Sequence, residues 1–206
     1  MIITNGYATL TQIKSVDRLN ISTADTNSDT TLEGIITAVS RSIDRECSRY
    51  FYKSTAHEVR YFTPKAEERI FVGDVVSVTN LYTDTLSGDR TYPTTWAATD
   101  YDLFPFDAAT MSEPEPYRWI DVTPTGSNRF PVRLAKGVKL DAVFGWNAVP
   151  AAITEACLLW SERWFKRYKT PLGISSMTAL GEMQVKAPPP DPDVMDLLQN
   201  YKVPAL

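Results

Sequence analysis

The sequence is poor in the residues and motifs on which most catalytic sites depend. It contains one histidine, two cysteines and nine glycines among 206 residues. No G-x-S-x-G, H-E-x-x-H, C-x-x-C, P-loop or G-x-G-x-x-G pattern occurs, and the glycines do not cluster into a phosphate-binding loop. These absences remove the usual sources of a nucleophile, a zinc site and a nucleotide site. We therefore expect no catalytic residue, no metal site and no cofactor.

A broad basic surface and long apolar runs are also missing. The net charge is −4 and the isoelectric point is about 5.1, which argues against a protein that binds by neutralising many phosphates. No apolar run reaches the roughly 18 residues that span a bilayer. The first residues, MIITNGYATLTQ, lack the pattern of a secretory signal. We expect a protein made in the cytoplasm without a membrane partner, in which Cys47 and Cys157 are buried thiols.

Three segments have helical periodicity. Helices are predicted at about 9–19, where Thr9 and Gln12 form a capping box, at 31–50 and at 150–168. The second is expected to bury one apolar face, and the third continues an apolar series at intervals of three and four residues. The predicted core residues of these two helices are Ile35, Val39, Ile43, Ile153, Trp160 and Trp164, and the two series extend to Cys47 and Tyr168.

Between residues 54 and 146 the periodicity becomes that of strands. Seven short runs rich in β-branched and aromatic residues are separated by turn residues. They predict an antiparallel sandwich or barrel-like domain inserted into a helical core, an α+β fold. The expected organisation is a core of residues 1–53 and 147–180, an inserted β-domain of residues 54–146 and an extended tail of residues 181–206.

The junction FGWNAVPAAI, residues 144–153, returns the chain from strands to helix. We expect Gly145 to allow a bend, Trp146 to pack there and Pro150 to begin the next helix. Further on, residues 188–190 form a stiff triple-proline spacer, and Asp191 and Pro192 begin a short final helix.

That final helix has an apolar face of Val194, Leu197, Leu198 and Tyr201. A helix of about ten residues is marginal alone in water, so this face must dock on a surface. The surface belongs either to another subunit or partner, or to the helix's own domain.

Several local patterns resemble sites, but each has a simpler interpretation. Asp25–Asp29 begins like a calcium loop, yet Thr30 and Ile36 replace the required glycine and glutamate, so a helix-capping loop is favoured. His57 is interpreted as a surface or packing residue of a strand.

The aromatic residues of the β-domain could bind sugar, but such residues more often pack across strands. The basic–aromatic run 162–169 suits the end of a helix better than a nucleic-acid site. The aromatic residues in question are Tyr92, Trp96, Tyr101, Tyr117 and Trp119, and the acidic pairs Asp100/Asp102 and Glu113/Glu115 are not placed as glycosidase pairs.

Several longer segments, taken in order, resemble the head–tail connector or adaptor proteins of tailed bacteriophages. They are YATLTQIKSV, IDRECSRYFY, GDRTYPTTWAATDYDLFPFDA, GWNAVPAAITEACLLWSERWFKRYKTPLG and DVMDLLQNY, and they cover nearly the whole chain. The most specific parts are Asp100–Pro105 and Gly145–Ile153.

The resemblance implies a non-enzymatic virion protein of the neck, assembled in the host bacterial cytoplasm. It implies a ring, commonly dodecameric, that docks on the portal protein and carries a further neck or tail-completion protein. It also implies that the C-terminal face of Val194, Leu197, Leu198 and Tyr201 engages the portal. Double-stranded DNA would pass through the ring without sequence-specific binding, during packaging and ejection. The alternatives are another neck protein, such as a tail-completion factor, and a carbohydrate- or host-surface-binding β-module.

Overall fold

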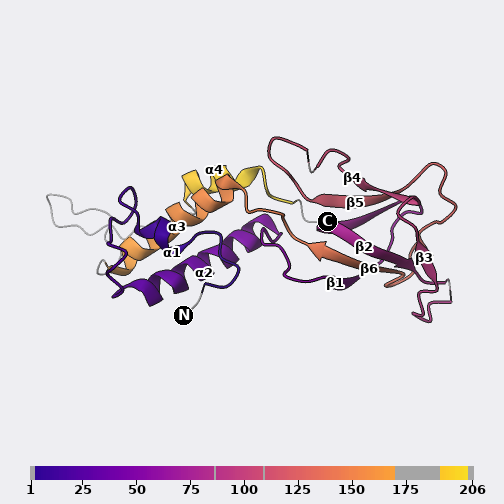
Figure 1. Cartoon of the computed structure of the whole chain (residues 1–206), viewed down its shortest axis with the longest axis horizontal. Helices are drawn as coiled ribbons and strands as arrows, with labels where there is room; N and C mark the ends of the chain where they lie inside the picture. The colour runs from indigo at the N-terminus through magenta and orange to yellow at the C-terminus, as the bar shows by residue number, and fades with distance from the viewer. Residues whose placement is uncertain (1–2, 86, 109, 170–190, 204–206) are drawn as a thin grey trace, which may run out of the picture. The chain divides into compact units, whose positions relative to one another are not determined.

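A computed structural model describes residues 3–85, 87–108, 110–169 and 191–203. The chain divides into a helical unit of residues 1–49 and 149–206 and a β unit of residues 50–148. The fold is α+β: helices make up the first unit and an antiparallel sheet the second (Figure 1). The expected boundaries at 54 and 146 lie within four residues of these. The predicted proline spacer at 188–190 lies outside the described residues.

The first helix is shorter than its apolar spacing predicts. α1 spans Leu10–Lys14 and begins with the expected capping box, in which the Gln12 backbone nitrogen lies 3.2 Å from Thr9 Oγ1 and the Thr9 nitrogen 2.8 Å from Gln12 Oε1. The helix ends at Ser15, where the chain turns. Val16, which lies within the predicted helix three residues after the buried Ile13, is 72% exposed. The predicted extension to residue 19 was therefore wrong.

Helix α2, Asp29–Cys47, begins two residues earlier and ends three residues earlier than predicted. Ser48 adopts a left-handed conformation with φ of 54°, which ends the helix. The N-cap is Ser28, at the end of the loop for which a capping role was expected. Val39 and Ile43 are fully buried as expected, whereas Ile35 is half-buried at the margin of the apolar face.

Helix α3, Ala151–Lys169, matches the predicted span to within one residue, but the face that it buries differs from the predicted face. Ile153, Ala156, Cys157 and Phe165 are buried, while Trp160 and Trp164 are half-buried and Tyr168 is 73% exposed. The helix packs on α2 and on α4, Pro192–Gln199. The predicted apolar face was therefore correct at Ile153 and Cys157 and wrong at Tyr168.

The seven strand-like runs form six strands in one antiparallel sheet, in the order β1-β6-β2-β5-β4, with β3 pairing to β2. The strands are β1 (Glu58–Phe62), β2 (Arg69–Thr83), β3 (Thr94–Trp96), β4 (Tyr101–Phe104), β5 (Tyr117–Val122) and β6 (Val138–Phe144). Two predicted runs merge in β2 through Gly73, whose φ is +77°. The described strands leave β1 and β4 as the two ends of the order, so the sheet does not close into a barrel.

Strand β2 organises the sheet because it pairs with three neighbours. Its first half pairs with β5, and its second half lies between β6 and β3. Its register shifts between Phe71 and Val75 and again near Ser77 and Asn80, as expected of β-bulges that bend a long strand. The buried side of the sheet forms one apolar core, in which Trp96 stacks on Phe130 at 4.7 Å between ring centroids.

The Gly145–Trp146 junction closes the β unit. Gly145 has φ of +99°, and a methyl group added there would collide with the backbone carbonyl of Tyr52. Trp146 is 1% exposed, and its ring lies 5.4 Å from that of Phe51. The bend and the packing expected at this junction are therefore present. Pro150 precedes α3 instead of occupying its first turn, and its carbonyl accepts from the Thr154 nitrogen at 3.0 Å.

Gly145→Ala should destabilise the β unit by roughly 2–4 kcal/mol, because it adds a steric collision to a backbone conformation that alanine rarely adopts. Gly34→Ala is the matched control: Gly34 lies within α2 with open space around it, and alanine favours helix by about 1 kcal/mol. Urea denaturation followed by near-ultraviolet circular dichroism measures both. Equal stability of the two variants would contradict this role of Gly145.

Candidate functional site

The C-terminal helix is the part of the chain to which the sequence assigns an interaction. It begins as predicted, with the Asp191 side chain accepting from the Asp193 nitrogen at 3.2 Å and Pro192 in the first turn. The Met195 nitrogen bonds the Asp191 carbonyl at 2.9 Å. These local interactions explain why the helix starts here.

The apolar face of α4 docks on the helical unit of its own chain. Val194 and Leu198 are fully buried, and α4 contacts α3 and α2. Leu197 and Tyr201 are half-buried. Of the two docking surfaces that the sequence leaves open, the structure uses the internal one for Val194 and Leu198. Portal binding by this segment stays a prediction, and these two side chains are not available to a partner while α4 is docked.

Polar contacts hold both ends of α4. Arg163 of α3 pairs with Asp191 and, at 2.8 Å, with Asp193. Past the helix, Lys202 Nζ lies 2.5 Å from Glu46 Oε1. The Val203 nitrogen donates to the Cys47 carbonyl at 3.1 Å. Exposed ion pairs contribute little stability each, so they chiefly fix the register of α4 on α2 and α3.

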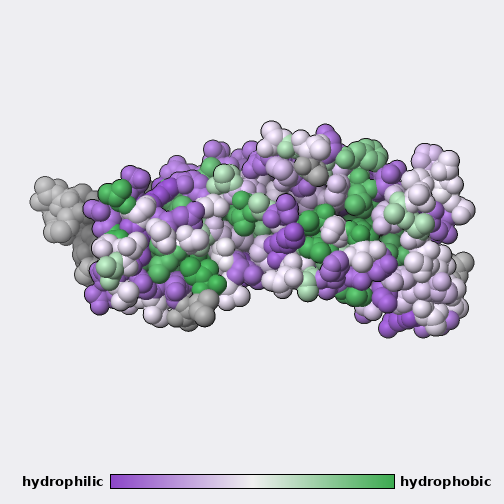
Figure 2. Space-filling model, in the orientation of Figure 1, coloured by the Kyte–Doolittle hydropathy of each residue, from purple (hydrophilic) through white to green (hydrophobic). Residues whose placement is uncertain are grey.

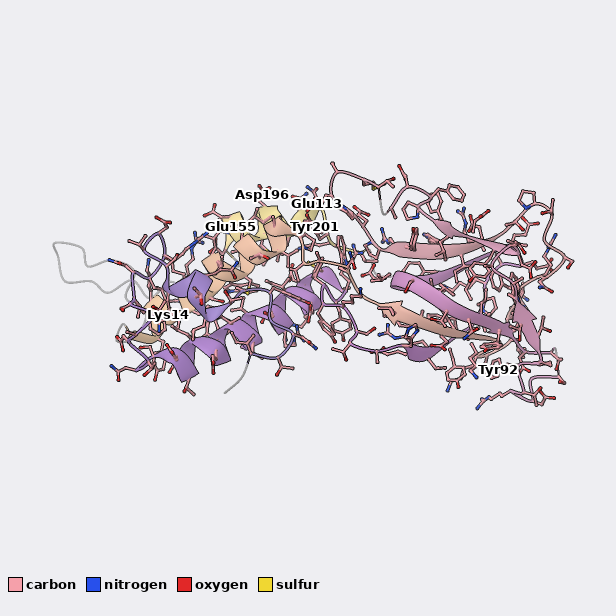
Figure 3. The ribbon with its side chains drawn as sticks, viewed as in Figure 1. Lys14, Tyr92, Glu113, Glu155, Asp196 and Tyr201 are labelled. Carbon is pink, nitrogen blue, oxygen red and sulfur yellow. The ribbon has the colours of Figure 1, made fainter. Side chains whose placement is uncertain are left out.

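The outward face of α4 is the remaining candidate surface. A shallow hollow is lined by Pro192, Met195, Asp196, Gln199 and Lys202, which recur at helical spacing along one side. Figure 3 shows Asp196 on this outer side of the helix. The hollow combines an apolar thioether with amide, carboxylate and ammonium groups.

A buried polar cluster lies where the N-terminal segment crosses α2. The Tyr7 hydroxyl donates to Asp44, Arg41 Nε lies 3.0 Å from Asp44 Oδ2, and the Tyr7 nitrogen donates to Ser40 Oγ at 3.1 Å. Burial raises the pKa of the Asp44 carboxyl, against the opposing effects of Tyr7 and Arg41. Every member has a structural partner, so the cluster fixes residues 3–8 on the helix.

The calcium-like loop holds an internal cation instead. Lys14 is 3% exposed, and its Nζ lies 2.6 Å from the Asp25 carbonyl oxygen and 2.7 Å from Asp29 Oδ1. In the part of the chain that the structure describes, no group of His, Cys, Asp or Glu is arranged to hold a metal ion. Lys14 therefore stabilises the loop that connects α1 to α2.

His57 has the surface position predicted for it. Its Nδ1 lies 2.5 Å from Thr79 Oγ1 and 3.9 Å from Asp141 Oδ1, beside the exposed strand β1. The two acidic residues Asp100 and Asp102 have different surroundings. Asp100 accepts hydrogen bonds from Asn128 and the Ala97 nitrogen, while Asp102 lies on β4.

The aromatic residues considered for sugar binding do not form one platform. Trp96 is 4% exposed, and its Nε1 donates to Thr83 Oγ1 at 3.0 Å, so it belongs to the core. Trp119 lies on the other side of the sheet, with its ring 4.9 Å from that of Phe71. In the run 162–169, Phe165 is buried and Lys166 pairs with Glu162 at 2.5 Å. None of the helices in the described ranges is long and apolar enough to cross a membrane.

No protein-family model and no curated protein matches the sequence. Among solved structures, a chain of the neck of an empty gene transfer agent particle, computed with C6 symmetry, has a TM-score of 0.57 at 15% identity, covering 100% of this chain and 94% of that one. A chain from the virion of a native gene transfer agent particle has a TM-score of 0.47 at 16% identity, covering 92% and 86%. The first likeness shows that the whole chain shares the fold of that neck chain.

Leu198→Ala should lower the free energy of unfolding of the helical unit by about 2–4 kcal/mol, because it removes a fully buried side chain from the contact of α4 with its own domain. Gln199→Ala, on the exposed side of the same helix, should change it by less than about 0.5 kcal/mol. Chemical denaturation monitored at helical wavelengths measures both. A Leu198→Ala variant as stable as Gln199→Ala would mean that α4 does not dock internally.

Both thiols should be unreactive in the native protein at pH 8. Cys47 and Cys157 are free and buried, and burial raises the pKa of the Cys47 thiol from 9.0 to about 11. The stability that this shift contributes is therefore fully present below pH 9 and is lost as pH rises through about 11. Titration with a chromogenic disulfide should detect thiols only after unfolding, whereas Ser112→Cys, at an exposed site, should add one fast-reacting thiol. Rapid labelling of the unmodified native chain would contradict the burial.

Proposed function

We propose that the protein is a structural component of the neck of a phage-like particle, where several copies form a ring adaptor at the head–tail junction. The observation that carries the proposal is the fold likeness to a gene transfer agent neck chain over the full length of this chain. The ordered sequence segments that resemble phage connectors support the same assignment independently of the fold.

A ring is the assembly that best fits this role. The similar neck was computed with C6 symmetry, and a dodecamer, the number implied by the resemblance to connectors, contains a six-fold axis. The ring would dock on the portal protein on one side and carry a further neck or tail-completion protein on the other. It would be assembled in the host cytoplasm and remain in the virion neck.

The internal docking of α4 changes the form of the predicted portal contact. Val194 and Leu198 are engaged with α3 and α2, so the contact would use the outward residues Met195, Asp196 and Gln199. Leu197 and Tyr201, both half-buried, would border it. This arrangement combines a rigid platform with an accessible surface, which reduces the ordering cost of binding.

The role proposed for the ring is passive conduction of double-stranded DNA. A net charge of −4 disfavours strong attachment of phosphates to the protein, which would impede packaging and ejection. The proposal includes neither catalysis nor a cofactor, and the DNA contacts it requires are independent of sequence.

Met195→Asp combined with Gln199→Lys should weaken portal binding by roughly tenfold or more, because both side chains lie on the outward face of α4. Native mass spectrometry of the protein mixed with the portal of the same particle measures the binding. Circular dichroism should show an unchanged fold.

The matched control is Thr30→Asp with Ala38→Lys, at two exposed positions of α2, which likewise leaves the net charge unchanged and should leave portal binding intact. Portal binding equal to that of the unmodified chain in both variants would place the contact elsewhere. No association of the unmodified chain with the portal would reject the adaptor function itself.

A further inference from the structure

The β unit has a basic surface near one end of its sheet. We define the lysine–tyrosine patch as Tyr61, Tyr82, Tyr92, Lys136 and Lys139. In the strand register, Tyr61 of β1 lies opposite Lys139 of β6, and Lys139 lies opposite Tyr82 of β2. The patch is thus one row across three neighbouring strands, extended by residues of two adjoining loops. Tyr92 of this patch is labelled in Figure 3.

The lysines of this patch contact aromatic rings rather than carboxylates. Lys139 Nζ lies 5.1 Å from the Tyr82 ring centroid and 5.9 Å from that of Tyr92, and Lys136 Nζ lies 5.9 Å from the Tyr61 ring. The Tyr92 hydroxyl donates to the Lys136 carbonyl at 2.8 Å, which orients the ring. Within the described ranges neither lysine forms a salt bridge, and Tyr61 is 47% exposed. Two positive charges are therefore presented on an ordered aromatic surface.

A surface of opposite charge lies at the edge of the sheet that β4 forms. We define the acidic–aromatic patch as Asp102, Phe104, Phe106 and Asp107, on β4 and the turn that follows it. The Phe104 and Phe106 rings meet edge to face at 5.4 Å, and Phe106 is 68% exposed. Figure 2 shows hydrophobic residues exposed in the region where Figure 1 draws β4 and β5.

Charges around this second patch leave its carboxylates available. Asp102 lies opposite Asp121 of β5, whose carboxylate is held by Arg69 through the Nε atom at 2.6 Å. Arg69 also lies over the Phe104 ring, 5.3 Å from its centroid. Asp102 and Asp107 are exposed and form no salt bridge with the part of the chain that the structure describes. The patch is negative, and it exposes the aromatic ring of Phe106.

The two patches are separated within one chain, because β5 lies between β4 and the strands β1, β6 and β2 that carry the lysine–tyrosine patch (Figure 1). Between two copies, however, they are complementary: each contributes aromatic area, and one is positive where the other is negative. A contact that joins two different surfaces is heterologous, and it generates a ring when its rotation closes. Aromatic centres with charges of opposite sign are typical of protein interfaces.

We infer that the lysine–tyrosine patch of one copy binds the acidic–aromatic patch of the next, and that this contact joins the β units around the ring. The inference rests on the proposed ring and specifies its subunit contact. The partner is a second copy of this chain, and the contact is made head to tail.

Charge reversal on full-length protein tests the contact. Lys136→Glu with Lys139→Glu, and separately Asp102→Lys with Asp107→Lys, should each weaken self-association by roughly tenfold or more. Sedimentation velocity over a concentration series, at low and high salt, measures it. The control is Arg45→Glu with Lys65→Glu, two exposed cations outside both patches, which imposes the same change in net charge as the first pair and should leave association intact.

Mixing the two charge-reversed variants tests directly whether the two patches bind each other. The first variant has two negative patches and the second two positive ones, so an alternating assembly makes every contact complementary. Equimolar mixing should therefore restore association to near the unmodified level, and high salt should weaken it.

The inference is overturned if the unmodified chain stays monomeric throughout the series, if reversal leaves association unchanged, or if mixing fails to restore it. Binding of a short DNA duplex that is lost on lysine reversal, without self-association, would also overturn it and assign the basic patch to nucleic acid. Portal binding is measured separately on the unmodified chain, so a failed patch contact leaves the neck assignment standing, whereas a failed portal interaction removes it.

Discussion

The structure depends on the apolar contact between α2 and α3, two helices separated in the chain by the whole β unit. Fully buried side chains lie on both helices, among them Val39, Ile43 and Cys47 of α2 and Ile153 and Cys157 of α3. Between the two helices Ser40 Oγ lies 3.6 Å from Cys157 Sγ, and Ser40 also accepts from the backbone of Tyr7. The β unit is thus inserted between two helices that pack on each other. α4 then uses the same pair as its support.

Several polar side chains of the helical unit serve its architecture. The buried Lys14 closes a loop and the buried Asp44 orders the N-terminal segment. The exposed Arg163 fixes the start of α4. The surfaces left for partners are the outward side of α4 and the two charged patches of the β unit. A ring adaptor needs contacts of both kinds, one toward a neighbouring component and one toward its own copies.

The helix starts, which depend on residues close together in the chain, were the part of the fold that the sequence predicted well. The Thr9–Gln12 capping box and the Asp191–Pro192 start of α4 involve residues within one helical turn, and both are confirmed. Strand content was also predictable, because every run of alternating residues became a strand or part of one. The errors arose where tertiary contacts decide. Val16 and Tyr168 continue apolar periodicities but face solvent, whereas Phe165, outside the predicted face, is buried. Likewise, the apolar face of α4 indicated that Val194 and Leu198 must dock, but no sequence pattern specified on which surface.

A cryo-EM reconstruction of the particle that contains this protein is the most direct test of the proposed ring. We expect a closed ring of this chain at the head–tail junction, with helical units against the portal and β units in contact around the ring. Density for the chain at any other position in the particle, or as single copies that do not form a ring, would contradict it.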